Sequence, residues 1–192
     1  MKFIKTELDG VFIIEPQVFE DNRGYFFESY SKSEFEKNGL NYEFVQDNQS
    51  KSSYGTIRGL HFQKGEFAQA KLVRVLKGNV LDVAVDIRFG SPTFGKYVKI
   101  KLSDQNNSQL LISRGVAHGF SVLSETAVLS YKCDNVYNKE SEGSIIFNDN
   151  DLDIDWGIDL NKALLSEKDL KSKTLKEYAE NPAFVYERKW NI

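Results

Sequence analysis

Short apolar runs, rich in β-branched and aromatic residues, repeat along the chain between residues 42 and 147 and are separated by turn residues. Separators such as Lys77-Gly78-Asn79 and Gly90-Ser91-Pro92 carry the glycine, proline and asparagine that favour turns. The runs fall at residues 42–47, 56–63, 70–76, 80–87, 97–102, 109–112, 118–122, 127–135 and 144–147. Short strands at this spacing indicate a β-sandwich or a β-barrel.

The N-terminal flank continues the β pattern and adds one helix. Asp9-Gly10 lies between two apolar runs in residues 3–14, which predicts a hairpin. The turn at 21–24 is followed by an aromatic strand, predicted at 25–30. Residues 31–37 are predicted to form a short helix, capped by a serine and ended by Asn38-Gly39.

The pattern changes after Trp156. Ser166 to Asp169 resembles a capping box, which predicts a helix over 170–178. The tail over 182–192 contains Phe184, Tyr186 and Trp190, so we expect it to dock on a surface such as a partner subunit. We therefore expect residues 1–192 to form a single domain, with a helical and irregular segment over 160–192 packed on it.

Composition narrows the class of protein. The chain has 192 residues and a net charge of −3, so its overall charge gives no sign of nucleic-acid binding. No apolar run approaches the length of a membrane span, and Glu7 and Asp9 interrupt any signal-peptide core. The single cysteine, Cys133, excludes an internal disulfide and fits the reducing cytoplasm.

Several classes of catalytic site are missing from the sequence. There is no G-x-S-x-G elbow, no Walker loop and no dinucleotide-binding glycine pattern. One cysteine and two histidines leave only a sparse set of two histidines and a carboxylate for a metal, so we expect neither a metal nor a cofactor. A metal-dependent enzyme is the least favoured of the alternatives.

Acid–base chemistry remains. His61 follows two glycines in a strand that alternates apolar and polar residues, and imidazole suits proton transfer near neutral pH. A half-buried structural histidine is the alternative. Lys71 lies either on the inner face of the sandwich, where its charge would be costly unless used, or in solvent. The ionisable candidates on strands are His61, Lys71, Asp82, Asp86, His118 and Tyr131. Scattered cations that suit phosphate binding, each also explicable as a surface charge, are Arg23, Arg58, Arg114 and Lys168.

Taken in order from about residue 5 to Asp169, these segments resemble the dTDP-4-dehydrorhamnose 3,5-epimerase family. The matching stretches are PQVFEDNRG (16–24), FVQDN (44–48), RGLHFQ (58–63), AQAKLVR (68–74), DVAVDIR (82–88), SPTFG (91–95), GVAHGF (115–120), SEG (141–143), ND (148–149) and DW (155–156). Each is weak alone, and the ordered set is specific.

The resemblance implies an all-β cupin-type jelly roll with a few short peripheral helices, which works without a cofactor as a homodimer whose N-terminal strand contributes to the partner's site. It implies that His61 is the base, Asp169 its paired carboxylate, Lys71 the cation that stabilises an enolate and Tyr131 the acid. Positions similar to the family's nucleotide-sugar contacts are Phe19, Arg23, Glu28, Gln46, Asp47, Asn48, Arg58, His118, Glu142 and Lys168.

The implied activity is inversion of C3 and C5 in a dTDP-4-keto-6-deoxy sugar, for dTDP-L-rhamnose biosynthesis. Two departures stand out: Ser113 replaces a frequent proline, and Val136 precedes Tyr137 where many members carry two tyrosines. The second leaves open how completely both carbons are inverted. The alternatives are an enzyme that inverts only C3, a ketoisomerase of a related sugar, and a sugar-nucleotide-binding cupin without catalysis.

Overall fold

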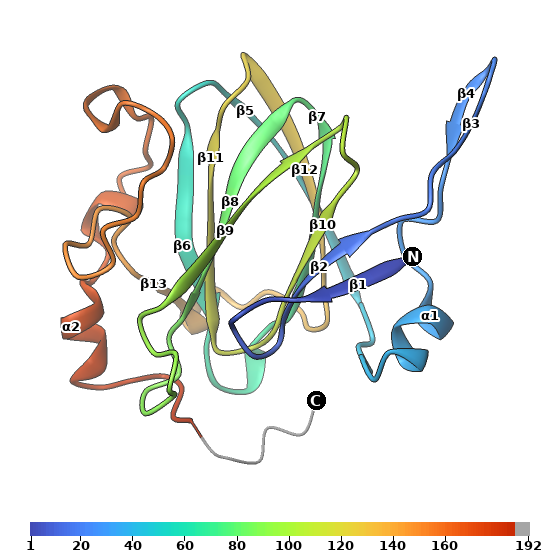
Figure 1. The fold of residues 1–192 in the computed structure, drawn as a ribbon. Coiled ribbons are helices and arrows are strands. Elements are labelled where there is room, and N and C mark those ends of the chain that lie inside the picture. The colour runs from blue at the N-terminus through green and yellow to red at the C-terminus, as the bar shows by residue number, and fades with distance from the viewer. Residues whose placement is uncertain (187–192) are drawn as a thin grey trace.

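A computed structural model describes residues 1–186, and antiparallel strands make up most of its ordered structure (Figure 1). The strands are β1 (Lys2–Lys5), β2 (Val11–Glu15), β3 (Phe19–Asp21), β4 (Gly24–Phe26), β5 (Gln46–Ser53), β6 (Ile57–Gln63), β7 (Lys71–Lys77), β8 (Asn79–Asp86), β9 (Tyr97–Ser103), β10 (Gln109–Ile112), β11 (Val116–Val122), β12 (Thr126–Cys133) and β13 (Glu142–Ser144). The α-helices are α1 (Lys32–Lys37) and α2 (Leu175–Ala179), and the 3₁₀ turns are η1 (Gly65–Phe67), η2 (Lys139–Ser141), η3 (Leu160–Lys162) and η4 (Asp169–Lys171).

Two antiparallel sheets form the body of the molecule. The larger sheet has the order β1-β2-β10-β7-β12-β5, and the smaller sheet has the order β13-β6-β11-β8-β9. Neighbours in these orders are mostly distant in sequence, as in a jelly roll. The predicted all-β jelly roll with short peripheral helices is therefore confirmed. None of the helices in the described part of the chain is long and apolar enough to cross a membrane.

Alternation along the strands decides which side chains fill the space between the sheets. In β8, Val80 and Ala84 join the core between the two sheets, while Val83 and Val85 pack on the opposite face. Successive strand residues point to opposite faces, so a polar residue at an inward position must find a partner or line a cavity. This rule places the candidate site.

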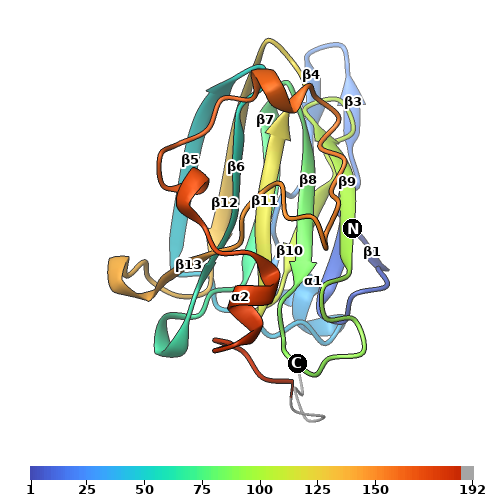
Figure 2. The same cartoon turned by 90° about the vertical axis from the view of Figure 1, so that its left-hand side faces the viewer.

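The segment after β13 covers the outer face of the smaller sheet (Figure 2). Trp156 is 1% exposed there, and its indole nitrogen donates to the carbonyl of Phe147 at 2.8 Å. The backbone of Leu164 accepts a hydrogen bond from the amide of Ile57 in β6 at 3.0 Å. The segment therefore lies directly behind the strand that carries His61.

Several predicted elements differ in the structure, among them the run at 144–147, which overlaps β13 only at Ser144. The aromatic strand predicted at 25–30 pairs only over Gly24–Phe26, because Tyr30 packs edge-on against Phe35 of α1 instead. The strand predicted at 42–47 is β5, which begins at Gln46 and extends to Ser53. Every residue of β5 is polar, so the apolar pattern of the sequence could not reveal its extent. Backbone pairing with β12 along its whole length holds it in place.

The helix predicted over 170–178 is broken. Lys173 lies in a β-bridge with Ile145 and accepts a hydrogen bond from the amide of Ile146 at 2.8 Å, which keeps the backbone extended there. The capping box lies at Thr174 and Glu177 and starts α2. Ser166 instead accepts the amide of Asp169 at 3.1 Å, ahead of the 3₁₀ turn η4.

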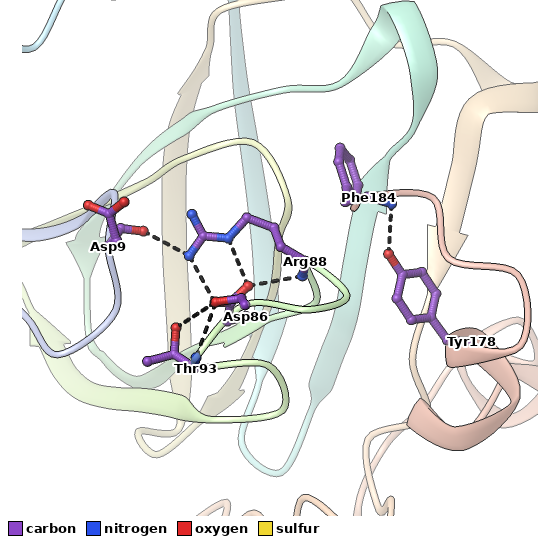
Figure 3. A network of polar contacts seen from close by, with 7 residues as sticks. Asp9, Asp86, Arg88, Thr93, Tyr178 and Phe184 are labelled. Atoms are coloured by element: carbon purple, nitrogen blue, oxygen red, sulfur yellow. Dashed lines mark hydrogen bonds and ion pairs between the residues drawn. The ribbon is translucent and has the colours of Figure 1, made fainter. Parts of the chain in front are cut away.

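The described part of the tail docks on its own chain, at the end of the barrel shown in Figure 3. The amide of Phe184 donates to the hydroxyl of Tyr178 at 3.1 Å, and its carbonyl accepts from the amide of Phe89 at 2.8 Å. Beside it, the guanidinium and the backbone amide of Arg88 together donate three hydrogen bonds to the fully buried carboxylate of Asp86. A partner subunit is not needed to cover Phe184; Trp190 lies outside the described residues.

Candidate active site

A pocket of about 280 Å³ opens between the two sheets at one end of the barrel. Its walls come from the larger sheet and from the smaller sheet together. The lining residues are Gln46, Asn48, His61, Phe62, Gln63, Gln69, Lys71, Tyr131, Tyr137, Glu142, Gly143 and Lys168. Most are polar, so the pocket suits a polar ligand.

A short polar contact joins His61 of the smaller sheet to Asp169, in the segment that follows β13. His61 Nε2 lies 2.5 Å from Asp169 Oδ1, and the Asp169 side chain is only 3% exposed. Burial on its own raises the pKa of Asp169, but hydrogen bonds from His61 and Ser166 hold that pKa below its ordinary value. Asp169 is therefore an anion that fixes the imidazole ring and leaves Nδ1 as the free nitrogen.

Lys71 and Tyr131 enter the pocket from the larger sheet. They lie on the neighbouring strands β7 and β12, and Lys71 Nζ is 5.9 Å from the centre of the Tyr131 ring. Burial lowers the pKa of Lys71. Burial raises the pKa of Tyr131, so its phenol keeps its proton at neutral pH. The pocket thus holds a base on one wall and a proton donor on the other.

The rim carries an ion pair between Lys168 and Glu142. Burial raises the pKa of Glu142, but the hydrogen bond and charge of Lys168 outweigh it and the net shift is downward. Lys168 is adjacent to Asp169, so a ligand bound to Lys168 would contact the same turn whose Asp169 orients His61. Tyr137 also stands at this rim, with its backbone amide bound to Gln46 Oε1 at 2.9 Å.

Not every predicted contact residue reaches this pocket. Gln46 and Asn48 face it from β5, whereas Asp47, between them, points to the opposite face of the sheet. There its carboxylate accepts a hydrogen bond from Lys132 at 2.6 Å. Asp47 therefore does not line this pocket, because alternate residues of a strand face opposite sides, and its assignment as a nucleotide-sugar contact stays a prediction.

Three further cations and histidines have partners elsewhere. Arg58 is exposed, donates to Ser52 Oγ at 3.0 Å and lies close enough to Tyr131 for its charge to lower the pKa of that phenol. His118 is 7% exposed and bound to Asp82 beneath the pocket, so it does not line the site as predicted. Arg114 pairs with Asp134 at 3.0 Å and is absent from the lining.

Phe19, Arg23 and Glu28 lie on or just after the hairpin β3–β4, which projects from the barrel in Figure 1. All three side chains are exposed, and Arg23 is paired with Asp21 of the same hairpin at 2.6 Å. None of the three lines the pocket of its own chain. We call residues 19–28 the arm.

The lining residues that were not predicted as part of the site include Gln63 and Gln69. Gln63 Oε1 accepts the amide of Asn138 at 2.9 Å, and Gln69 Nε2 donates to the carbonyl of Asn135 at 2.7 Å. They hold the loop that carries Tyr137. The alternation of His61-Phe62-Gln63 already placed Gln63 on the face of His61, so that signal was present in the sequence.

The geometry permits proton removal by His61, stabilisation of a developing oxyanion by Lys71, and proton donation by Tyr131. Within residues 1–186, no three histidine, cysteine, aspartate or glutamate side chains are grouped as a metal site. The chemistry that this arrangement favours is proton transfer at carbon next to a carbonyl.

Comparison with known proteins gives a consistent result. The family model for dTDP-4-dehydrorhamnose 3,5-epimerase matches residues 5–177. The dTDP-4-dehydrorhamnose 3,5-epimerase of Methanothermobacter thermautotrophicus is 46% identical over 185 residues, which are 96% of this chain and 98% of that protein.

Two crystal structures are similar throughout. The dTDP-4-dehydrorhamnose 3,5-epimerase from Elizabethkingia anophelis is 61% identical with a TM-score of 0.89, covering 92% of this chain and 97% of that one. The dTDP-6-deoxy-D-glucose-3,5-epimerase from Legionella pneumophila, solved with dTDP-4-keto-L-rhamnose, is 45% identical with a TM-score of 0.92, covering 97% and 98%.

Proposed function

The chain belongs to the dTDP-4-dehydrorhamnose 3,5-epimerase family, and we propose that His61, Asp169, Lys71 and Tyr131 carry out its proton transfers. It is an isomerase that inverts C3 and C5 of dTDP-4-dehydro-6-deoxy-D-glucose, giving dTDP-4-dehydro-L-rhamnose for dTDP-L-rhamnose biosynthesis. The observation that carries the residue assignment is the His61–Asp169 contact at the edge of a pocket that also contains Lys71 and Tyr131.

The substrate determines what the site must do. C3 and C5 both flank the C4 ketone, so loss of a proton from either carbon gives an enolate. These protons are acidified by the carbonyl but remain too weakly acidic for water to remove quickly. An oriented base, a cation at the ketone oxygen and an acid on the opposite face are sufficient for inversion.

His61 is the base in this scheme. Because its Nε2 is bound to Asp169, Nδ1 takes the proton from carbon, and the buried carboxylate stabilises the imidazolium that forms. Asp169 itself keeps its charge, since its pKa is held below the ordinary value. General-base catalysis of this kind contributes about 10²–10⁴ to a rate.

Lys71 stabilises the enolate oxygen. Lys71 is the first residue of β7, is partly exposed and lines the pocket. Its ammonium can therefore meet the C4 oxygen, where negative charge develops. Loss of one such electrostatic contact typically costs about 10²–10³ in rate.

Tyr131 returns a proton from the opposite face. His61 is carried by β6 of the smaller sheet and Tyr131 by β12 of the larger sheet, so base and acid stand on facing walls. A sugar bound between the walls has one face toward each, as inversion requires. The ring must present C3 and C5 to this pair in turn.

The remaining lining residues bind the nucleotide. Lys168 suits the diphosphate, as does the exposed Arg58 outside the lining. Gln46, Asn48 and Glu142 offer hydrogen bonds, and the ring of Tyr137 can stack on the base. For the substrate, Lys168 has to exchange its partner Glu142 for phosphate oxygens.

We further propose a homodimer in which the arm completes the partner's pocket. Phe19 and Phe26 are 56% and 67% exposed, and Arg23 is bound only to Asp21 of its own hairpin within the described chain. Such an aromatic surface with a cation suits a nucleotide base and a diphosphate. The buried thiol of Cys133 fits the cytoplasm as the place of action.

Subunit complementation tests the exchange of arms. Arg23→Ala removes the cation of the arm, and Lys71→Gln removes the cation of the pocket, so each homodimer is expected to be nearly inactive. A mixed dimer contains one site with an intact arm and an intact pocket, and should recover turnover after subunit exchange. If the mixture shows only the summed activity of the two separate variants, the proposed exchange of arms is contradicted.

Incubation with dTDP-4-keto-6-deoxyglucose in D₂O tests the activity itself. NMR should show deuterium at C3 and C5 of the inverted product, and prior treatment with EDTA should leave the rate unchanged. Deuterium at C3 alone would make the protein a C3 epimerase. Binding of dTDP without any exchange would make it a binding protein, and activity restored by a divalent metal would require a metal-dependent mechanism.

A further inference from the structure

A second histidine–carboxylate pair lies beneath the pocket, and the scheme above gives it no task. His118 Nε2 donates to both carboxylate oxygens of Asp82, at 2.9 and 3.0 Å. Asp82 is 0% exposed and His118 is 7% exposed. Within the described residues, these are the only hydrogen bonds to the Asp82 carboxylate. A fully buried anion is costly, so it needs a positive charge nearby.

The strand register fixes where this pair points. His118 is directly opposite His61 in the β11–β6 ladder. Asp82 lies midway between Val80 and Ala84 on β8, so it shares their face, which points to the core between the sheets. Lys71 faces the same interior from β7 of the opposite sheet, next to Val73 on that face. Asp82, His118 and Lys71 therefore all face the interior between the two sheets.

Lys71 has several ionisable neighbours around the pocket. From the elements packed against it these are Tyr131 and Cys133 on β12, His61 on β6, Asp82 on β8, Glu142 on β13, and Lys168 and Asp169 at η4. Among residues 1–186, no carboxylate oxygen lies within 4.0 Å of Lys71 Nζ. The ammonium is thus free to bind a substrate oxygen, but it has no direct counter-ion.

The neighbours differ in whether they can support a positive charge on Lys71. Burial raises the pKa of the Cys133 thiol to about 11, so Cys133 carries no charge at neutral pH. Glu142 is already paired with Lys168, and Asp169 with His61. Asp82 and Glu142 are the carboxylates whose charges raise the pKa of Lys71; Asp82 is the larger contributor, and its hydrogen-bond partner is an imidazole and not an ammonium.

We propose that Asp82 is a positioning residue that keeps Lys71 an ammonium at the C4 oxygen, and that His118 holds Asp82 out of direct contact with it. This rests on the role of Lys71 proposed above. A direct ion pair would occupy the ammonium and draw it away from the substrate. The carboxylate of Asp82, bound to His118, stabilises the positive charge of Lys71 without taking the hydrogen bond that the ammonium donates to the substrate. His118 is accordingly reassigned from the substrate to the support of Lys71.

Titration of Lys71 by NMR tests this without turnover. In protein labelled with ¹³C-lysine, the Lys71 signal is assigned from its loss in Lys71→Arg, and its pKa is compared between the wild type and Asp82→Asn. Removing an opposite charge at this range is expected to lower the pKa of Lys71 by about one unit or more. Glu125→Gln, which removes a carboxylate from the exposed surface, is the matched control and should leave it unchanged.

The same variants give a kinetic readout. In Asp82→Asn the alkaline limb of kcat/KM, which reports the pKa of the free enzyme, should move to lower pH by the shift that NMR measures. An unchanged Lys71 pKa in folded Asp82→Asn overturns the proposal, and so does a wild-type Lys71 that is already neutral at pH 7. A wild-type Lys71 that is neutral at pH 7 overturns the proposal even if Asp82→Asn fails to fold. If the wild type titrates as proposed but never turns over the 4-keto sugar, the proposed function fails and the charge support stands.

Discussion

His61 and Asp169 are 108 residues apart in the sequence, yet His61 Nε2 lies 2.5 Å from Asp169 Oδ1. The contact exists because the segment after β13 folds back over the smaller sheet and bonds to β6 through Leu164. Asp169 then begins the 3₁₀ turn η4, with its amide fixed by Ser166. The site is therefore completed by a segment outside the jelly roll that supplies its other groups.

Asp169→Asn is expected to destabilise the protein at neutral pH by about 1–3 kcal/mol, as for a buried hydrogen bond to a charged group. Burial raises the pKa of Asp169, but its hydrogen bonds and the charges of His61 and Lys168 hold it below its ordinary value. A carboxylate with a lowered pKa stabilises the fold above its unfolded pKa, and that contribution is lost as the pH falls through the folded value. Urea unfolding should therefore show a difference at pH 7 that narrows below about pH 4; a difference independent of pH would contradict the charge of Asp169.

Tyr131→Phe is expected to separate proton removal from inversion. The base remains, so deuterium from D₂O should still enter the substrate with retained configuration, while inverted product falls by about 10²-fold or more. Tyr137→Phe keeps the ring that stacks on the nucleotide and should preserve kcat. If instead Tyr137→Phe loses inversion and Tyr131→Phe does not, the acid has been assigned to the wrong tyrosine.

Asn48→Ala and Asp47→Ala form a matched pair on β5. Asn48 faces the pocket, so its loss should raise KM about tenfold, the effect of one missing hydrogen bond. Asp47 pairs with Lys132 on the other face, in an exposed contact that contributes little to stability. In Asp47→Ala, kcat and KM should therefore change less than about threefold. Steady-state kinetics that gave the two variants equal losses would be incompatible with this strand register.

Phe184→Ala and Val185→Ala test the docked tail. Phe184 is 6% exposed, and its ring centre lies 6.0 Å from that of Phe62, the residue next to His61. Truncating this buried ring should lower the free energy of unfolding by about 3–5 kcal/mol. Val185 is 56% exposed, and its truncation should change stability by less than about 0.5 kcal/mol. Urea unfolding measures both; equal effects would mean that Phe184 is not buried in solution.

The strands of the barrel could be predicted wherever apolar alternation is strong. The run predicted at 109–112 is β10, and the runs at 70–76 and 80–87 match β7 and β8 to within a residue at each end. β5 could not be placed in this way, because its stability comes from its ladder with β12 and not from apolar side chains. Local sequence preference also could not reveal that Lys173 bridges to Ile145 and interrupts a helix.

The site was predictable in part. Alternation put His61 and Gln63 on one face and left Lys71 with two possible faces, and the structure places it inward. The proximity of Asp169 to His61 has no local signal, since it depends on how a long segment folds back; only the family resemblance suggested it. The same resemblance included Asp47 and His118, whose surroundings here are the outer face of the sheet and the buried Asp82.

The most direct test of the account is the D₂O exchange assay with His61→Ala. Exchange at both C3 and C5 is expected to fall by about 10²–10⁴, the contribution of a general base, while binding of dTDP and the unfolding transition stay close to those of the wild type. Exchange at the wild-type rate in a folded His61→Ala protein would contradict the assignment of His61 as the base.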